Sequence, residues 1–158
     1  MSLHAATHVL CLLLACGFGA AGVFASVRDA RTRTIPNACC GAICLLGLAL
    51  CCLRALTGAL PALPTPISCA TVAVATLLLG VAAEGAYRAV SGRVGLGLGD
   101  VKYMAAWACA LGWWVVPALA AACLGGALYA CTRRERTFAM APWLTLAFAC
   151  AFVGALLR

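Results

Sequence analysis

The stretch LHAATHVLCLLLACGFGAAGVFASV occupies residues 3–27 and contains no Asp, Glu, Lys or Arg. A helix that crosses the hydrocarbon core of a bilayer needs about 20 predominantly apolar residues, so this stretch is long enough for one crossing. It lacks the positively charged start of a secretory signal peptide. We therefore expect it to be a retained first membrane helix.

Similar apolar runs recur along the whole chain. Of its 158 residues 66% are hydrophobic and 9% charged, whereas a soluble domain carries about a quarter charged residues. This composition excludes a soluble globular enzyme. We predict an all-α, polytopic integral membrane protein in which residues 1–158 form a single membrane-embedded domain with no separate soluble domain. The six transmembrane helices are expected near residues 4–26, 38–56, 67–87, 100–112, 114–131 and 140–157.

The basic residues predict how this bundle is oriented. In the six-helix arrangement nine of the eleven Lys and Arg residues fall on one side of the membrane, which the positive-inside rule makes cytoplasmic. Both termini then lie on the non-cytoplasmic side. The net charge of +7 is spread between apolar runs instead of forming one basic face with aromatic residues, so we expect no nucleic-acid partner. The lipid bilayer is the expected environment.

Cysteine is abundant, with twelve residues, but most of them lie inside apolar runs, where they are expected to pack as small hydrophobic side chains. No Cys-x-x-Cys pair occurs, and neither His4 nor His8 has a Cys or carboxylate near it at ligand spacing. We expect no metal, no cofactor and no structural disulfide.

Only four acidic residues are present: Asp29, Glu84, Asp100 and Glu135. Glu84 precedes Arg88 by four residues, which predicts an ordinary ion pair near a helix end. Glu135 lies among arginines and is expected to be solvated. The expected topology places Asp29 and Asp100 at cytoplasmic helix ends at similar depth, so these two are candidates to meet.

Asp29 opens the segment DARTRTIPN, residues 29–37. A purely structural interpretation is a charged turn after the first helix, closed by Pro36, with Asn37 capping the second helix. A catalytic role for Asp29 is the alternative, and the residue types alone leave both open.

Asp100 belongs to the segment GLGLGDVK, residues 95–102, directly before an apolar run. The structural interpretation makes Asp100 an N-cap and the glycines a flexible connector. The functional interpretation notes that glycines permit close approach of a peptide backbone, and that a carboxylate at the membrane boundary indicates a functional site.

Two neighbouring carboxylates suggest a definite chemistry. Because both cannot ionise cheaply, one tends to hold a proton while the other is charged. The charged member can activate water as a general base, and the protonated member can act as a general acid. Peptide hydrolysis then needs no metal. A serine hydrolase is not expected, since the serines, Ser26 among them, lack a histidine partner on the same side.

In this order and spacing the two segments resemble the type IV prepilin peptidase family, which are aspartic peptidases of the bacterial inner membrane. The resemblance rests on Asp29 followed six residues later by Ile35, Pro36 and Asn37, and on Gly97, Gly99, Asp100 and Lys102 at the start of a later helix. It covers nearly the whole chain. It implies that Asp29 and Asp100 are the catalytic pair and that the other six residues form the supporting motifs.

The resemblance also implies the reaction. The expected substrate is a prepilin or pseudopilin, whose leader is cleaved on the cytoplasmic side after a Gly near the start of the substrate's hydrophobic helix. The small size is most similar to the short branch that serves Flp-type, tight-adherence pili. Larger members carry an insertion with paired Cys-x-x-Cys motifs and methylate the new amino terminus, so we expect no methyltransferase activity here. Pilus or secretion assembly proteins are further possible partners. The segment 138–142 is given no catalytic role.

Two other functions remain as alternatives. Intramembrane aspartates also serve as proton relays, which would suit a small proton-coupled transporter with carboxylates near the bilayer midplane. A non-catalytic membrane subunit of a pilus or secretion assembly would not need either aspartate for substrate processing.

Overall fold

The computed structural model describes residues 3–58, 64–93, 95–133 and 139–156, and all regular structure in these ranges is helical. The described part of the chain contains six α-helices and one short 3-10 helix, so the all-α prediction is confirmed. The elements are α1 (Leu3–Thr32), α2 (Asn37–Thr57), α3 (Pro66–Ser91), α4 (Leu98–Leu111), the 3-10 helix η1 (Gly112–Trp114), α5 (Val115–Arg133) and α6 (Ala141–Leu156).

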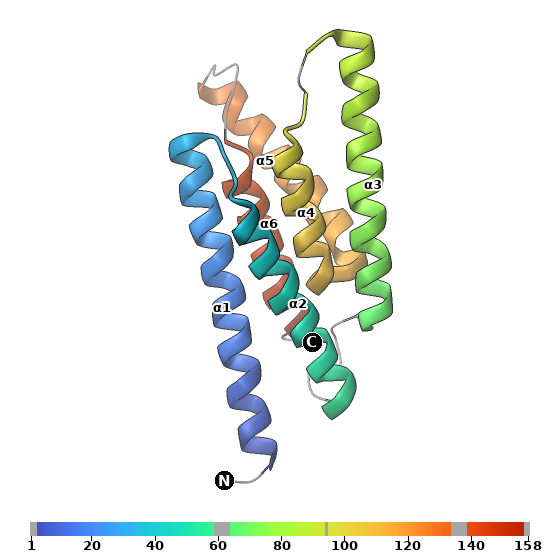
Figure 1. The fold of residues 1–158 in the computed structure, drawn as a ribbon. Coiled ribbons are helices and arrows are strands. Elements are labelled where there is room, and N and C mark those ends of the chain that lie inside the picture. The colour runs from blue at the N-terminus through green and yellow to red at the C-terminus, as the bar shows by residue number, and fades with distance from the viewer. Residues whose placement is uncertain (1–2, 59–63, 94, 134–138, 157–158) are drawn as a thin grey trace.

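Consecutive helices run in opposite directions along one bundle (Figure 1). The α1–α2 and α3–α4 connections lie at the same end, at the top of the picture, and α6 also begins there. We call this the motif end, because residues 33–36, 92–93 and 95–97 lie in its connections. The two sequence motifs are therefore brought to one end of the bundle.

Four stretches of the described helices have the length and apolar composition of membrane spans: Ala5–Thr32, Asn37–Thr57, Pro66–Ser91 and Leu98–Arg133. The last of these contains two antiparallel helices, because the chain reverses at η1, where Gly112 has a φ of 52°. Helices α4 and α6, with 14 and 16 residues, are shorter than the roughly 20 residues of a full crossing. The multi-pass character is supported, while six complete crossings and the side of each terminus stay predictions.

The first helix extends beyond its predicted end at residue 26. It continues to Thr32 and places Asp29 in its last turn, so the expected charged turn after the helix is wrong. Hydropathy predicts where the apolar part of a helix ends. The helix itself can continue beyond that point, because polar residues also adopt helical structure in water. The helix ends where Arg33 adopts a left-handed φ of 54° and donates its N–H to the Asp29 carbonyl oxygen at 2.8 Å.

The two side-chain caps expected from the motifs are also wrong. Pro36 is the N-cap residue of α2, and Asn37 is already the first helical residue. Gly97 is the N-cap residue of α4, which places Asp100 in the first helical turn. Both aspartates are thus held on helices and neither is the N-cap residue of its own helix.

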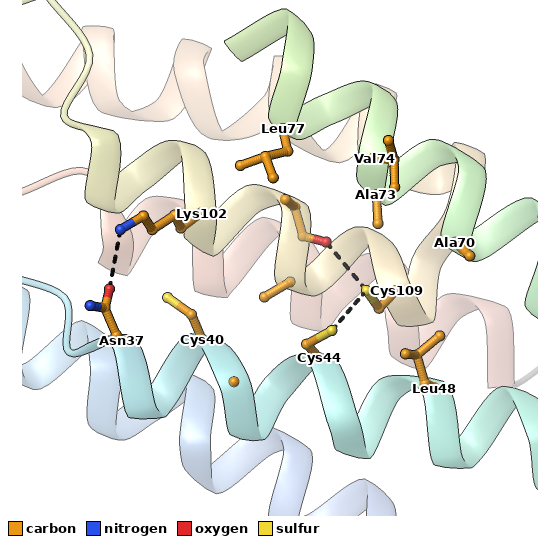
Figure 2. Close-up of a pocket in the computed structure, with 13 residues that line it drawn as sticks. Asn37, Cys40, Cys44, Leu48, Ala70, Ala73, Val74, Leu77, Lys102 and Cys109 are labelled. Atoms are coloured by element: carbon orange, nitrogen blue, oxygen red, sulfur yellow. Dashed lines mark hydrogen bonds between the residues drawn. The ribbon is translucent and has the colours of Figure 1, made fainter. Parts of the chain in front are cut away.

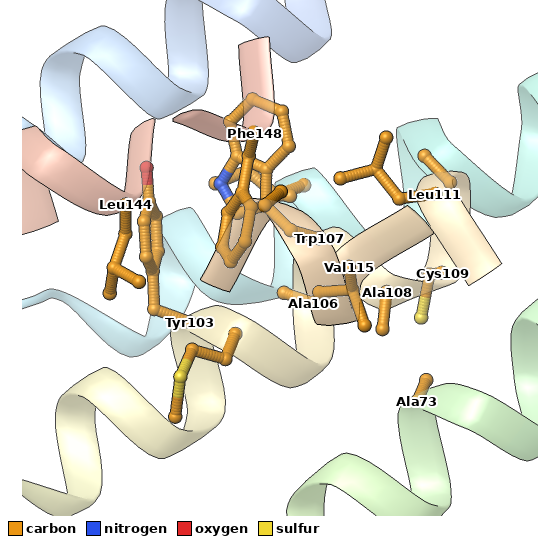
Figure 3. Close-up of a cluster of buried hydrophobic side chains, with 14 of the residues drawn as sticks. Ala73, Tyr103, Ala106, Trp107, Ala108, Cys109, Leu111, Val115, Leu144 and Phe148 are labelled. Atoms are coloured by element: carbon orange, nitrogen blue, oxygen red, sulfur yellow. The ribbon is translucent and has the colours of Figure 1, made fainter. Parts of the chain in front are cut away.

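Helix α4 lies at the centre of the core, and nearly all its residues from Val101 to Leu111 are buried. The Trp107 ring packs edge-on against Phe18 of α1, with 4.5 Å between ring centroids, and lies 5.6 Å from the Phe148 ring of α6 (Figure 3). A Cβ atom at Gly22 would lie 2.7 Å from the Trp107 ring, so this position requires glycine. Close approach of α1 to α4 thus depends on a missing side chain.

Three details of the sequence analysis lie outside the described residues. These are the surroundings of Glu135, the arginines on either side of it, and Phe138 of the segment before the last helix.

Candidate functional site

Asp29 and Asp100 come together at the motif end. Both line one cavity of about 290 Å³, Asp29 from the last turn of α1 and Asp100 from the first turn of α4. The charge of Asp29 is close enough to act on the Asp100 carboxyl. The cavity is lined by Asp29, Arg33, Thr34, Ile35, Asn37, Gly97, Gly99, Asp100 and Lys102.

Asp29 is buried, with 6% of its surface exposed. Its Oδ2 atom accepts a hydrogen bond of 3.1 Å from the backbone N–H of Ala141, the first residue of α6. The amino end of a helix has free N–H groups, and an N–H donor suits a carboxylate oxygen. Helix α6 therefore fixes the Asp29 side chain through its backbone. The residue types of the segment 138–142 predict no catalytic role, because a backbone donor leaves no mark in them.

Asp100 is partly exposed to the cavity, and the surrounding backbone leaves space for its carboxylate. A Cβ atom at Gly97 would lie 3.2 Å from Asp100 Oδ2, closer than side chains normally approach. On the other side of α4, Gly80 of α3 permits close packing, since a Cβ atom there would lie 2.6 Å from Val101 Cγ1. Small residues on both sides thus position Asp100.

The remaining motif residues surround the two aspartates. Pro36 begins α2 by accepting the N–H of Cys39 at 3.0 Å, and this turn brings Ile35 and Asn37 into the cavity wall. Gly99 faces Ile35, with 3.8 Å between its Cβ position and Ile35 Cβ. The structure therefore brings seven of the eight predicted residues to one cavity and uses Pro36 to build its wall.

Lys102 links the two motifs. Its Nζ atom donates a hydrogen bond of 3.4 Å to Asn37 Oδ1, which connects α4 to α2. The ammonium group lies in the wall of the same cavity as the two carboxylates. Lys102 therefore adds a positive charge to a cavity that holds two acidic side chains.

Glu84 has a larger role than the predicted ion pair. The pair exists, with Arg88 Nε donating to Glu84 Oε1 at 2.5 Å, but Glu84 is only 3% exposed. Glu84 Oε1 also accepts the backbone N–H of Gly95 at 3.3 Å, and Oε2 accepts that of Leu96 at 2.6 Å. One carboxylate thus anchors the loop that leads into Gly97 and Asp100. The position of Glu84 inside the apolar run 67–87 is the sequence signal for this role, because a charged side chain in an apolar segment costs free energy and usually marks a functional group.

A second missed feature is a group of hydroxyls that we call the hydroxyl cluster: Ser26, Tyr103 and Thr145. Tyr103 OH lies 2.5 Å from Thr145 Oγ1 and donates to the Gly22 carbonyl oxygen at 3.2 Å. Ser26 contacts the Thr145 hydroxyl directly. Ser26 lies one helical turn from Asp29 on α1, and Tyr103 lies one helical turn from Asp100 on α4. The cluster joins α1, α4 and α6 beneath the cavity, and nothing in the sequence pairs these residues.

The polar residues that line the cavity bring two carboxylates, two cationic groups from Arg33 and Lys102, the Asn37 amide and the Thr34 hydroxyl. Within the described ranges no group of three or more His, Cys, Asp or Glu side chains is placed to hold a metal ion. The arrangement suits proton transfer and activation of water, because two carboxylates beside one another can divide the roles of base and acid.

Comparison with known proteins supplies the family. Residues 16–131, which include both motifs, match the type IV leader peptidase family. The chain belongs to this family. No curated protein and no solved structure matches the chain. Membership confirms the resemblance drawn from the motifs and makes the chain a protease of the prepilin leader peptidase type, in agreement with the long apolar helices of a multi-pass membrane protein.

Proposed function

We propose that this leader peptidase is an aspartic endopeptidase, with Asp29 and Asp100 as its catalytic pair, that removes the leader peptide of prepilin or prepilin-like proteins. The observation that carries the proposal is the shared cavity, into which α1 and α4 each bring one carboxylate. A proton-coupled transporter would be expected to hold its carboxylates near mid-bundle, whereas this pair lies at one end.

The proposed chemistry follows from the pair. The ionised carboxylate takes a proton from water as the water oxygen adds to the scissile carbonyl carbon, and the protonated partner donates its proton to the carbonyl oxygen. When the C–N bond breaks, the leaving nitrogen receives a proton from the carboxyl that was charged at the start, and one hydroxyl of the tetrahedral intermediate returns its proton to the partner carboxylate. The N–H of Ala141 holds the Asp29 carboxylate in place during these transfers.

The motif end is proposed to face the cytoplasm. The basic residues Arg28, Arg31, Arg33, Arg93 and Lys102 lie in or beside its helix ends, whereas Arg54 lies near the opposite end of α2. Lys and Arg are concentrated in cytoplasmic loops, and these charges also attract anionic headgroups. We place the protein in a bacterial inner membrane on the same grounds.

We further propose that the substrate belongs to Flp-type or similar pili and that no methyl transfer follows cleavage. The chain has no Cys-x-x-Cys pair of the kind that accompanies methylation in larger members of the family. Assembly proteins of a pilus or secretion system are the proposed partners.

The experiment is cleavage of a tagged prepilin precursor in cells that lack their own prepilin peptidase. The unchanged chain is expected to produce mature pilin, whereas Asp29→Asn and Asp100→Asn should each abolish cleavage while the protein still accumulates in the membrane. The matched control is Glu135→Gln, which turns a carboxylate outside the pair into an amide. Inside-out vesicles should cleave added precursor and right-side-out vesicles should not. Mature pilin from both aspartate variants would overturn the proposal.

A further inference from the structure

An apolar groove of about 530 Å³ runs along α4 between α2 and α3 (Figure 2). It exists because α4 packs closely against both α2 and α3, whereas α2 and α3 make few contacts with each other. Figure 2 shows Cys44 and Leu48 of α2 facing Ala73 and Val74 of α3 across this space. The floor of the groove is formed by buried core residues such as Cys40, Ala106 and Cys109.

The lining of the groove is small and apolar along most of its length, as at Gly41, Ala70, Ala73 and Ala105. Val74 is 56% exposed, so the groove opens to the surface of the bundle. Helices α2 and α3 and the stretch that contains α4 have the composition of membrane spans. In a bilayer this surface faces hydrocarbon, so its occupant must itself be apolar.

The groove adjoins the aspartate cavity. Asn37 and Lys102 line both spaces, and they are the polar residues at one end of the groove. A chain whose peptide bond lies at Asp29 and Asp100 therefore has the start of the groove beside it, at this hydrogen-bonded pair. From Asn37 to Leu48 the groove follows α2 for eleven residues, which corresponds to about 16 Å or three helical turns.

We propose that this groove binds the apolar helix of the substrate that adjoins the cleaved bond. The inference rests on the proposed function. A lipid chain would also suit an apolar surface, but it gives no reason for the groove to begin beside the catalytic cavity and share Asn37 and Lys102 with it. Binding an apolar helix here would hold the cleavage site at a fixed distance from the aspartates, because packed helices do not slide freely.

Gly41 provides the test of this groove. A Cβ atom at Gly41 would meet no other atom within 4 Å, so Gly41→Leu can begin a bulky side chain in the groove without a clash at its Cβ. Gly19 of α1 has the same open surroundings and does not line the groove, so Gly19→Leu is the matched control. For a tagged prepilin precursor with its entire apolar helix, Gly41→Leu should raise KM about tenfold with kcat nearly unchanged, as loss of ground-state binding predicts. Gly19→Leu should have the same KM as the chain without substitutions.

A photocrosslinking residue supplies independent evidence. Placed at Val74 in the Asp100→Asn variant, it should form adducts that map to the apolar helix of the precursor. Placed at Leu124, an exposed residue of α5 outside the groove, it should form adducts with lipid alone. If the unchanged protein cleaves the precursor while Gly41→Leu keeps its KM and Val74 yields lipid adducts alone, the groove proposal is wrong and the proposed function stands. Failure of the unchanged protein to cleave the precursor would instead reject the proposed function.

Discussion

Glu84 Oε2 accepts a hydrogen bond of 2.6 Å from the backbone N–H of Leu96, so a buried side chain of α3 holds the loop that leads into the helix of Asp100. The other oxygen of the same carboxylate accepts from Arg88 and from Gly95. A carboxylate can accept at both oxygens, whereas an amide must turn its NH₂ group toward one set of donors. Negative charge and acceptor capacity are therefore both needed at this position.

This relationship predicts that Glu84→Gln slows cleavage, because the loop loses an acceptor and Asp100 moves. We expect kcat to fall about tenfold or more, equivalent to about 1.4 kcal/mol in the barrier. The comparison is Arg88→Ala, which removes the partly exposed ion-pair partner and leaves both backbone hydrogen bonds. It should reduce kcat less than Glu84→Gln does. Equal effects of the two variants would mean that Glu84 serves Arg88 and not the loop. Cleavage kinetics and thermal stability in detergent provide the measurements.

The contrast between Glu84 and the motifs indicates what a sequence can predict. All six helices follow from apolar runs, because a bilayer requires them, and the meeting of Asp29 with Asp100 follows from counting crossings. The end of α1 was missed because polar residues continue a helix as well as apolar ones do. The loop anchor was missed because Glu84 next to Arg88 satisfies a local rule, and local rules do not indicate a backbone partner eleven residues away.

The support beneath the cavity was hidden for another reason. Ala141 acts through its backbone N–H, and the hydroxyls of Tyr103 and Thr145 meet only when three helices pack. Thr145 carries no signal by residue type, since Ser and Thr hydroxyls inside apolar helices commonly bond to their own backbone, as this one also does at Ala141. Such contacts depend on how each helix is rotated about its own axis. The spacing of apolar residues predicts this rotation poorly when a helix is apolar on every side.

A second prediction concerns the contact between α3 and α4. A methyl group at Gly80 would lie 2.6 Å from Val101, a stiff β-branched side chain next to Asp100. Gly80→Ala should therefore lower stability by about 1–3 kcal/mol, the usual cost of overpacking, and reduce cleavage by displacing the start of α4. Gly85→Ala on the same helix is the control, because a Cβ atom there meets nothing within 4 Å. Thermal unfolding and cleavage rates of both variants test the prediction, which fails if the two behave alike.

A third prediction concerns the hydroxyl cluster, which joins the helices of both aspartates to α6. Tyr103→Phe and Thr145→Val each remove one hydroxyl while nearly keeping the shape of the side chain. Each should lower the free energy of unfolding by about 1 kcal/mol, the net value of a typical hydrogen bond, or more where a buried partner is left unsatisfied. Both variants should also lower kcat by a larger factor than they change KM, because the aspartates shift relative to each other. The control is Thr71→Val, since the hydroxyl of this exposed residue bonds to the Ser68 carbonyl oxygen of its own helix.

The double variant separates a shared interaction from two independent losses. Tyr103 OH and Thr145 Oγ1 lie 2.5 Å apart, so removing the second hydroxyl after the first should cost less than removing it alone. Residues in one hydrogen-bonded network show such non-additivity, typically about 0.5–3 kcal/mol. If the two costs simply add in both stability and kcat, the hydroxyls act separately, and the cluster does not couple α4 to α6. A sub-additive result in kcat would mean that the contact between these helices helps to set the position of the aspartate pair.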